Sequence, residues 1–166
     1  MKKLLPILIL IFLFSCKTEI EKASEQQIKD SIMNVLMDEM GDNFIERNFN
    51  NNEIKNAPVK ILFCKFVQDS TSTQRNIELF YKNVSKKNIV AVRFKWYGEN
   101  IYGDPADMGI YKGYGGGSSE QLVKPNEEAV VSWNNYSNDG KNIIGCRPEE
   151  IVFEDGSKWK LKNLIN

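Results

Sequence analysis

The order of hydrophobic and polar residues changes character along the chain. An apolar run occupies positions 4–14 behind two lysines, and residues 25–40 then repeat apolar side chains three and four positions apart. From residue 59 onward the period becomes two, which is the spacing of strands with one buried face. The pattern therefore predicts an apolar leader, one amphipathic helix and a mostly β remainder.

The predicted helix over residues 25–40 has signals at both ends. Ser24 and Gln27 fit a capping box, and Gly41 fits the left-handed position just past a helix end. Its apolar face packs on the protein's own body or, being rich in methionine, docks a partner. The Asn-rich residues 42–57 that follow are interpreted as a linker with one more helical turn around Phe44. The apolar face consists of Ile28, Ile32, Met33, Val35, Leu36, Met37 and Met40.

Six later segments are predicted strands, the clearest being 89–97, where Val90, Val92, Phe94 and Trp96 point one way and Ala91, Arg93 and Lys95 the other. The glycine-rich residues 111–119 lack the Lys-Ser/Thr of a phosphate loop and are interpreted as a flexible connection. The other strand segments are 59–67, 76–82, 128–136, 143–153 and 158–161. The residues predicted to be buried between two sheets are Val92, Phe94, Trp96, Val131, Trp133, Phe153 and Trp159.

The last two strands allow a prediction of register. A two-residue turn at Asp155-Gly156 would mix aromatic residues and lysines on each face of the hairpin. A three-residue loop over 154–156, with Gly156 left-handed, instead places Ile151 opposite Trp159 and gathers the apolar residues on one face. The hydrophobic pattern therefore predicts the three-residue loop.

Six or seven short strands separated by turns predict a mostly β fold, an antiparallel sandwich over residues 58–166 preceded by one N-terminal helix. The stretch 77–159 resembles a family of small immunoglobulin-like domains of unknown function in bacterial envelope proteins. The resemblance implies an immunoglobulin-like fold and no activity, and the antibody-type Cys…Trp…Cys spacing is absent. The matching motifs are residues 79–94, Gly103-Asp104-Pro105, Lys124-Pro125-Asn126-Glu127 through Trp133, and 152–159.

The first sixteen residues have the layout of a secretory signal: two lysines, an apolar run, a small residue and then Cys16. Residues 13–16, Leu-Phe-Ser-Cys, resemble the lipobox of bacterial lipoproteins. The resemblance implies cleavage after residues 1–15, lipidation and acylation of Cys16, and a polar tether over 16–23. An ordinary secretory signal and a short uncleaved anchor are the alternatives. Lys17, standing where an Asp retains lipoproteins at the inner membrane, favours the outer membrane where one exists.

Charge and composition exclude several classes of function. The chain has 22 basic and 22 acidic residues, and loss of Lys2 and Lys3 with the signal leaves 20 against 22, a net charge of −2. Such a chain has no electrostatic basis for binding nucleic acid. It contains no histidine, the commonest general base and metal ligand. We therefore expect no enzymatic activity, no cofactor and no metal.

Two cysteines remain once Cys16 is assigned to the lipid. Cys64 and Cys146 form an even pair in what is predicted to be an exported, oxidising location. Both lie in apolar, strand-like surroundings. They are either a disulfide between an early and a late strand or two buried free thiols, because cysteine packs as a small hydrophobic residue.

The candidate ligand-binding residues are tyrosines in or beside loops. Tyr102, Tyr111, Tyr114 and Tyr136 alternate with Asn and Gly, and such tyrosines bind protein or sugar through a flat apolar ring with a polar tip. The alternative is that they pack the edges of the sandwich. The expected function is a lipid-anchored envelope protein with a non-catalytic interaction module, whose specific ligand the sequence does not name and whose expected partner is an envelope protein or a glycan. The second hypothesis is a glycan-binding module.

Overall fold

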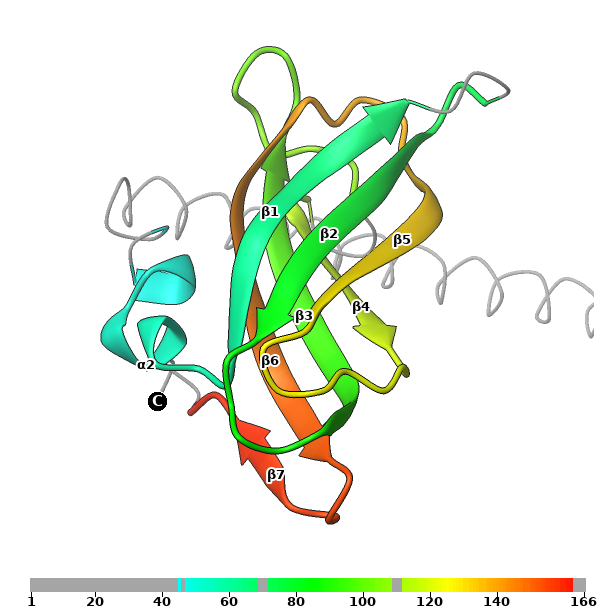
Figure 1. Cartoon of the computed structure of the whole chain (residues 1–166). Coiled ribbons are helices and arrows are strands. Elements are labelled where there is room, and N and C mark those ends of the chain that lie inside the picture. The colour runs from blue at the N-terminus through cyan, green and yellow to red at the C-terminus, as the bar shows by residue number, and fades with distance from the viewer. Residues whose placement is uncertain (1–44, 46, 69–71, 109–111, 163–166) are drawn as a thin grey trace, which may run out of the picture. The chain divides into compact units, whose positions relative to one another are not determined.

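The computed structural model describes residues 45, 47–68, 72–108 and 112–162 (Figure 1). The signal segment, Cys16 and the helix predicted over residues 25–40 lie outside these residues. No helix in the described ranges is long and apolar enough to cross a membrane. The elements are α2 (Asn52–Lys55), β1 (Val59–Gln68), β2 (Arg75–Asn83), β3 (Ile89–Glu99), β4 (Tyr114–Ser119), β5 (Glu128–Ser137), β6 (Asn142–Phe153) and β7 (Lys158–Lys160).

The strands form two antiparallel sheets, one of order β1-β2-β5 and the other of order β4-β3-β6-β7. The sheets lie face to face around a shared hydrophobic core (Figure 1). The predicted immunoglobulin-like β-sandwich is therefore confirmed. In this sandwich β4 pairs with β3 rather than with β5. One sheet therefore has three strands and the other has four.

The core is built from alternate positions of the strands, as a period of two requires. Ile77, Leu79 and Tyr81 of β2 are fully buried on one face. Trp96 and Trp133 bring their ring centroids within 4.7 Å and so join the two sheets. Of the predicted core residues, Val92, Phe94, Trp96 and Phe153 are buried, and Val131, Trp133 and Trp159 pack against the core while partly exposed.

The glycine-rich stretch forms strand β4, so its interpretation as a flexible connection is wrong. β4 pairs with β3 over its whole length. A Cβ atom on Gly115 would lie 2.3 Å from Nε1 of Trp96, and one on Gly117 would lie 2.3 Å from Cε2 of Trp133. The strand runs so close to the aromatic core that only glycine fits at these positions.

Irregularities in two strands change which residues face the core. In β3 the register with β6 shifts between Ile89 and Ala91, and Ile89 rather than Val90 is fully buried. In β1 an extra residue lies between Ile61 and Phe63. Such a bulge reverses the alternation that follows it. These positions are therefore exceptions to the simple pattern of the sequence.

The C-terminal hairpin has the predicted register. Ile151 pairs with Trp159, and Gly156 has a φ of 79°, in the left-handed region. Ile151 is fully buried, and Trp159 is half-buried against the core. The predicted three-residue loop is confirmed, and its physical reason is that it buries the apolar face of both strands.

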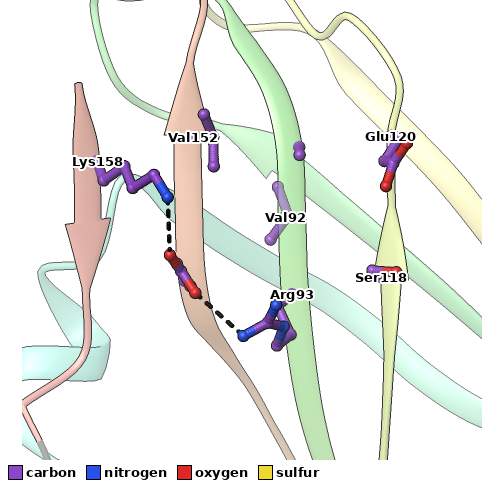
Figure 2. A pocket seen from close by; sticks show the side chains of 8 residues that line it. Val92, Arg93, Ser118, Glu120, Val152 and Lys158 are labelled. Carbon is purple, nitrogen blue, oxygen red and sulfur yellow. Dashed lines mark hydrogen bonds and ion pairs between the residues drawn. The ribbon is translucent and has the colours of Figure 1, made fainter. Parts of the chain in front are cut away.

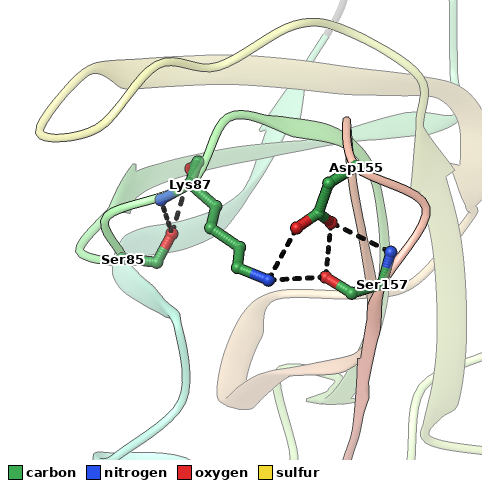
Figure 3. A network of polar contacts seen from close by, with 4 residues as sticks. All are labelled: Ser85, Lys87, Asp155 and Ser157. Carbon is green, nitrogen blue, oxygen red and sulfur yellow. Dashed lines mark hydrogen bonds and ion pairs between the residues drawn. The ribbon is translucent and has the colours of Figure 1, made fainter.

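A polar network ties this turn to the turn between β2 and β3 (Figure 3). Nζ of Lys87 lies 2.7 Å from Oδ2 of Asp155 and donates a hydrogen bond to Oγ of Ser157 at 2.9 Å. Ser157 in turn donates to Oδ1 of Asp155 at 2.5 Å. The hydrogen bonds from Lys87 and Ser157 hold the pKa of Asp155 well below its usual range. Each exposed contact contributes little to stability, but together they fix the two turns side by side.

The segment before β1 packs on the sandwich instead of forming a free linker. Phe49 is only 7% exposed, and a Cβ atom on Gly145 would lie 2.4 Å from Cγ of Phe49. Nη1 of Arg147 donates a hydrogen bond to the carbonyl oxygen of Asn48 at 2.6 Å. The sandwich predicted to start at residue 58 is thus extended by packed residues that precede it, while Phe44 lies outside the described residues.

Candidate functional site

An open groove lies on the outer face of the four-stranded sheet, and Figure 2 shows the residues that line its first part. It consists of two adjoining hollows, with cavity volumes of about 240 and 290 Å³. Arg93 and Ser118 line both hollows and join them. The remaining lining residues are Ala91, Val92, Glu120, Glu150, Val152 and Lys158 in the first hollow, and Phe94, Lys95, Gly116 and Gly117 in the second.

Strand register places the polar residues of the groove in one row. Arg93 pairs with Ser118 of β4 on one side and with Glu150 of β6 on the other. Arg93 points outward because it stands between Val92 and Phe94, which are buried in the core. Lys158 of β7 pairs with Val152, two residues along β6 from Glu150, so the groove brings together residues of all four strands.

Glu150 is the centre of the charges in the groove. Its carboxylate accepts a hydrogen bond from Nη1 of Arg93 at 3.1 Å and lies 3.5 Å from Nζ of Lys158, as the dashed lines of Figure 2 show. The Glu150 side chain is 20% exposed, whereas those of Arg93 and Lys158 are 58% and 61% exposed. Each pair stabilises the fold by at most about 1 kcal/mol. Their main effect is to hold two cations at fixed positions facing solvent.

The second hollow lies where Gly116 has no side chain beside Lys95, and a Cβ atom on Gly116 would lie 3.0 Å from Cδ of Lys95. The backbone of β4 at this point is bound by Tyr136 of β5, whose hydroxyl accepts a hydrogen bond from the amide of Gly116 at 2.8 Å and donates one to the carbonyl oxygen of Gly116 at 2.9 Å. The Tyr136 ring packs edge-on against Trp96, with ring centroids 5.2 Å apart. This predicted ligand-binding tyrosine thus caps the backbone of an edge strand, a position that otherwise invites pairing with another chain.

The other candidate tyrosines do not gather into one site. Tyr114 is half-buried and meets Tyr97 edge-on with ring centroids 5.1 Å apart, and its ring lies 6.4 Å from that of Phe49. Burial, reinforced by Tyr97, raises the pKa of Tyr114 well above its usual range. Tyr102 is 86% exposed in the loop between β3 and β4. Tyr111 lies outside the described residues.

The two candidate disulfide residues come together across the sandwich. Cys64 of β1 and Cys146 of β6 are free thiols that pack against the same core. Burial raises the pKa of the Cys146 thiol well above its ordinary value, and a hydrogen bond with Cys64 adds to the effect. The sequence allowed a disulfide or two free thiols. The structure contains the thiols, side by side.

The loop between β3 and β4 is tied to the loop after β5 by Asp107. Its carboxylate accepts hydrogen bonds from Oγ of Ser137 at 2.5 Å, the amide of Asn138 at 3.0 Å and the amide of Asp139 at 3.2 Å. Burial opposes ionisation of Asp107, but these hydrogen bonds outweigh it and hold its pKa well below the usual range. Asp107 therefore serves as a clasp between loops. In the described ranges, no three His, Cys, Asp or Glu side chains are grouped to hold a metal ion.

Sequence reasoning did not identify Arg93, Glu150 and Lys158 as a group. Each occupies an outward position of an alternating strand, and their charges are complementary, which is the only signal that the sequence carries. The order of strands within a sheet is set by long-range pairing, and the alternation of residues along one strand does not predict it. The group was therefore visible only in the fold.

Comparison with known proteins gives little further information. No protein-family model matches the chain, and no curated protein does. Among solved structures the chain is similar to a hypothetical protein of Peptoclostridium difficile 630, with a TM-score of 0.49 and 12% sequence identity. The similarity covers 64% of this chain and 88% of that chain.

Proposed function

We propose that the protein is a lipid-anchored protein of the cell envelope whose β-sandwich is a non-catalytic module for binding another envelope protein. The support for the anchor is the arrangement of residues 1–16, which ends in Cys16. The support for the module is the groove centred on Glu150. The observation that best supports a binding module is this row of charged side chains on one face of the sheet.

The groove suits a protein surface better than a small molecule. Small-molecule sites are mostly apolar cavities of roughly 300–1,000 Å³ that enclose their ligand. The two hollows here are smaller, and charged or backbone groups line much of them. The lining contains three basic side chains and two acidic ones, so its net charge is +1. They are Arg93, Lys95 and Lys158, and Glu120 and Glu150. Fixed charges of this kind steer and orient an oppositely charged partner, and we expect carboxylates on the partner's surface.

The glycan hypothesis receives less support from the geometry. It relied on loop tyrosines offering free ring faces, yet Tyr114 and Tyr136 use their rings or hydroxyls in packing and edge capping. Of the candidates in the described ranges, Tyr102 has the exposed ring. A glycan array distinguishes the two ideas, because saturable sugar binding that is lost in Tyr102→Ala would favour the glycan hypothesis.

The anchor is tested by fractionation of cells that express the full chain. Wild-type protein should be found in the membrane fraction as a processed, acylated product, and Cys16→Ser should accumulate as an uncleaved precursor. Cys64→Ser is the matched control, because it removes a cysteine without touching the signal. A processed, membrane-bound Cys16→Ser product would contradict the lipoprotein proposal.

The module is tested by affinity capture from envelope extract. A double variant, Arg93→Ala with Lys158→Ala, should lose most of the partner that the wild type retains. The difference in capture between the wild type and the double variant should be smaller at high salt, because salt screens the charges. Lys65→Ala is a matched control, since it removes an exposed, ion-paired lysine from the other sheet. Equal capture by the wild type and the double variant would show that the groove is not the binding surface.

A further inference from the structure

The contact between Cys64 and Cys146 is a product of the fold. The two residues are 82 positions apart, on strands of different sheets. They lie against the same core, and β1 and β6 are in contact across the sandwich. Both are half-buried, and a hydrogen bond joins the two thiols. Two sulfur atoms brought together in this way are one oxidation step from a covalent link.

The bulge in β1 explains how Cys64 reaches this position. Before the bulge, Val59 and Ile61 stand on the core side of the strand, and simple alternation would continue to Phe63 and leave Cys64 outside. The extra residue reverses the order, so Phe63 is 40% exposed and Cys64 pairs with buried Leu79. A backbone irregularity thus turns the cysteine toward β6.

On β6, Cys146 occupies the position opposite Trp96, whose side chain is fully buried. Directly opposed residues of a pair of strands share a face, so Cys146 also faces the core. The two cysteines therefore face the core from opposite layers, on strands that are in contact across the sandwich. This is the arrangement that a cross-sheet disulfide requires.

We propose that Cys64 and Cys146 are a redox-active pair that closes into a disulfide linking the two sheets when the chain meets a disulfide-bearing oxidant. The thiolate of Cys64 attacks one sulfur of the oxidant and releases its other half as a thiol. The thiolate of Cys146 then attacks the mixed disulfide and releases the second half. Two thiols of the protein are oxidised, one disulfide of the oxidant is reduced to two thiols, and both protons leave with those thiols.

The order of attack follows from the surroundings of the two residues. Both thiols are partly exposed, but desolvation and the contact with Cys64 raise the pKa of Cys146, which keeps Cys146 protonated and a poor first nucleophile. Cys64 lies on β1, which is an edge strand of its sheet, so an oxidant approaches it more easily. The exported location proposed above supplies such an oxidant, but the reaction itself depends only on the geometry of the pair.

The test is peptide mapping of the purified full chain after incubation with oxidised glutathione. The protein is alkylated under denaturing, non-reducing conditions and digested with trypsin. Cleavage after Lys60, Lys65, Lys141 and Lys158 gives peptides 61–65 and 142–158, because Arg147 precedes proline and is not cut. We expect these two peptides to be joined by a disulfide and to separate when reductant is added.

Two separately alkylated or glutathione-capped peptides would overturn the proposal. The result does not depend on the anchor, because Cys16 is in neither peptide. Failure of the lipoprotein proposal would appear in the fractionation of Cys16→Ser, whereas failure of the pair would appear here. A linked pair in the purified chain therefore supports the redox pair whatever the location of the protein.

Thermal unfolding gives a second, independent measurement. A link across 82 positions restricts the unfolded chain, so reduction of the oxidised wild type should lower Tm by roughly 10 °C. Cys64→Ser, Cys146→Ser and the double variant should show nearly equal losses, because either change removes the same bond. Additive losses, together with no effect of reductant on the wild type, would show that the cysteines act only as packing residues.

Discussion

Replacing Gly117 by alanine tests whether the glycine-rich stretch is a strand packed on the core. A Cβ atom at Gly117 would lie 2.3 Å from Cε2 and 2.4 Å from Nε1 of Trp133. These distances are shorter than any real contact, so either the indole ring must move or β4 must separate from β3. Because the contact is with the middle of a rigid ring rather than with a flexible end, the strain cannot be relieved locally.

The expected magnitude combines two opposing effects. Adding a methyl group to a packed core costs about 1–3 kcal/mol. Replacing glycine by alanine restricts the unfolded chain and returns about 0.4–1 kcal/mol. We therefore expect Gly117→Ala to lower the free energy of unfolding by roughly 1–2 kcal/mol.

Urea unfolding followed by far-UV circular dichroism measures this change. Ser118→Ala is the matched control on the same strand, since Ser118 is exposed, and its effect should stay within about 0.5 kcal/mol. A Trp133→Leu background should reduce the cost of Gly117→Ala, because the smaller side chain leaves room for the methyl group. The coupling between the two substitutions then identifies Trp133 as the source of the strain.

The opposite sign would refute the reasoning. In a flexible loop, Gly117→Ala has no contact to violate, and its effect on the unfolded chain alone would stabilise the protein by about 0.4–1 kcal/mol. A Gly117→Ala variant that is as stable as the wild type, or more stable, would show that β4 does not pack against Trp133.

Three further predictions concern the core, the sheet edge and the loops. Phe94→Ala should cost roughly 3–5 kcal/mol in urea unfolding and Lys95→Ala less than about 0.5 kcal/mol; equal losses would mean that the outer face is also covered. Tyr136→Phe should cost about 1–2 kcal/mol and speed hydrogen exchange at Gly116, and unchanged exchange would contradict the capping role. The depressed pKa of Asp107 means that its carboxylate stabilises the fold above its unfolded pKa of about 4 and loses this effect as pH falls toward the folded pKa. The free energy of unfolding of the wild type should therefore fall more than that of Asp107→Asn between about pH 5 and pH 3. An equal fall in both proteins would show that the Asp107 carboxylate does not stabilise the contact between the two loops.

The alternation of residues by itself determined most of the sandwich. It predicted six of the described strands close to their observed bounds, because each of these strands has one buried and one solvated face. It also determined the register of the C-terminal hairpin, since only one loop length gathers Ile151 and Trp159 on the same side. Where burial dictates the period, the sequence alone is sufficient.

Tertiary structure decided the positions where neighbours, rather than periodicity, dictate the residue. The glycines of β4 indicate flexibility in the sequence but are required by the rings of Trp96 and Trp133, which come from other strands. The bulge at residue 62 reverses the face of Cys64, and the alternation of residues along β1 does not predict this bulge. The sequence did not predict the groove and left open how Cys64 and Cys146 are arranged, for the same reason: period two assigns each residue a face, and only the order of strands and the packing of sheets decide which residues meet there.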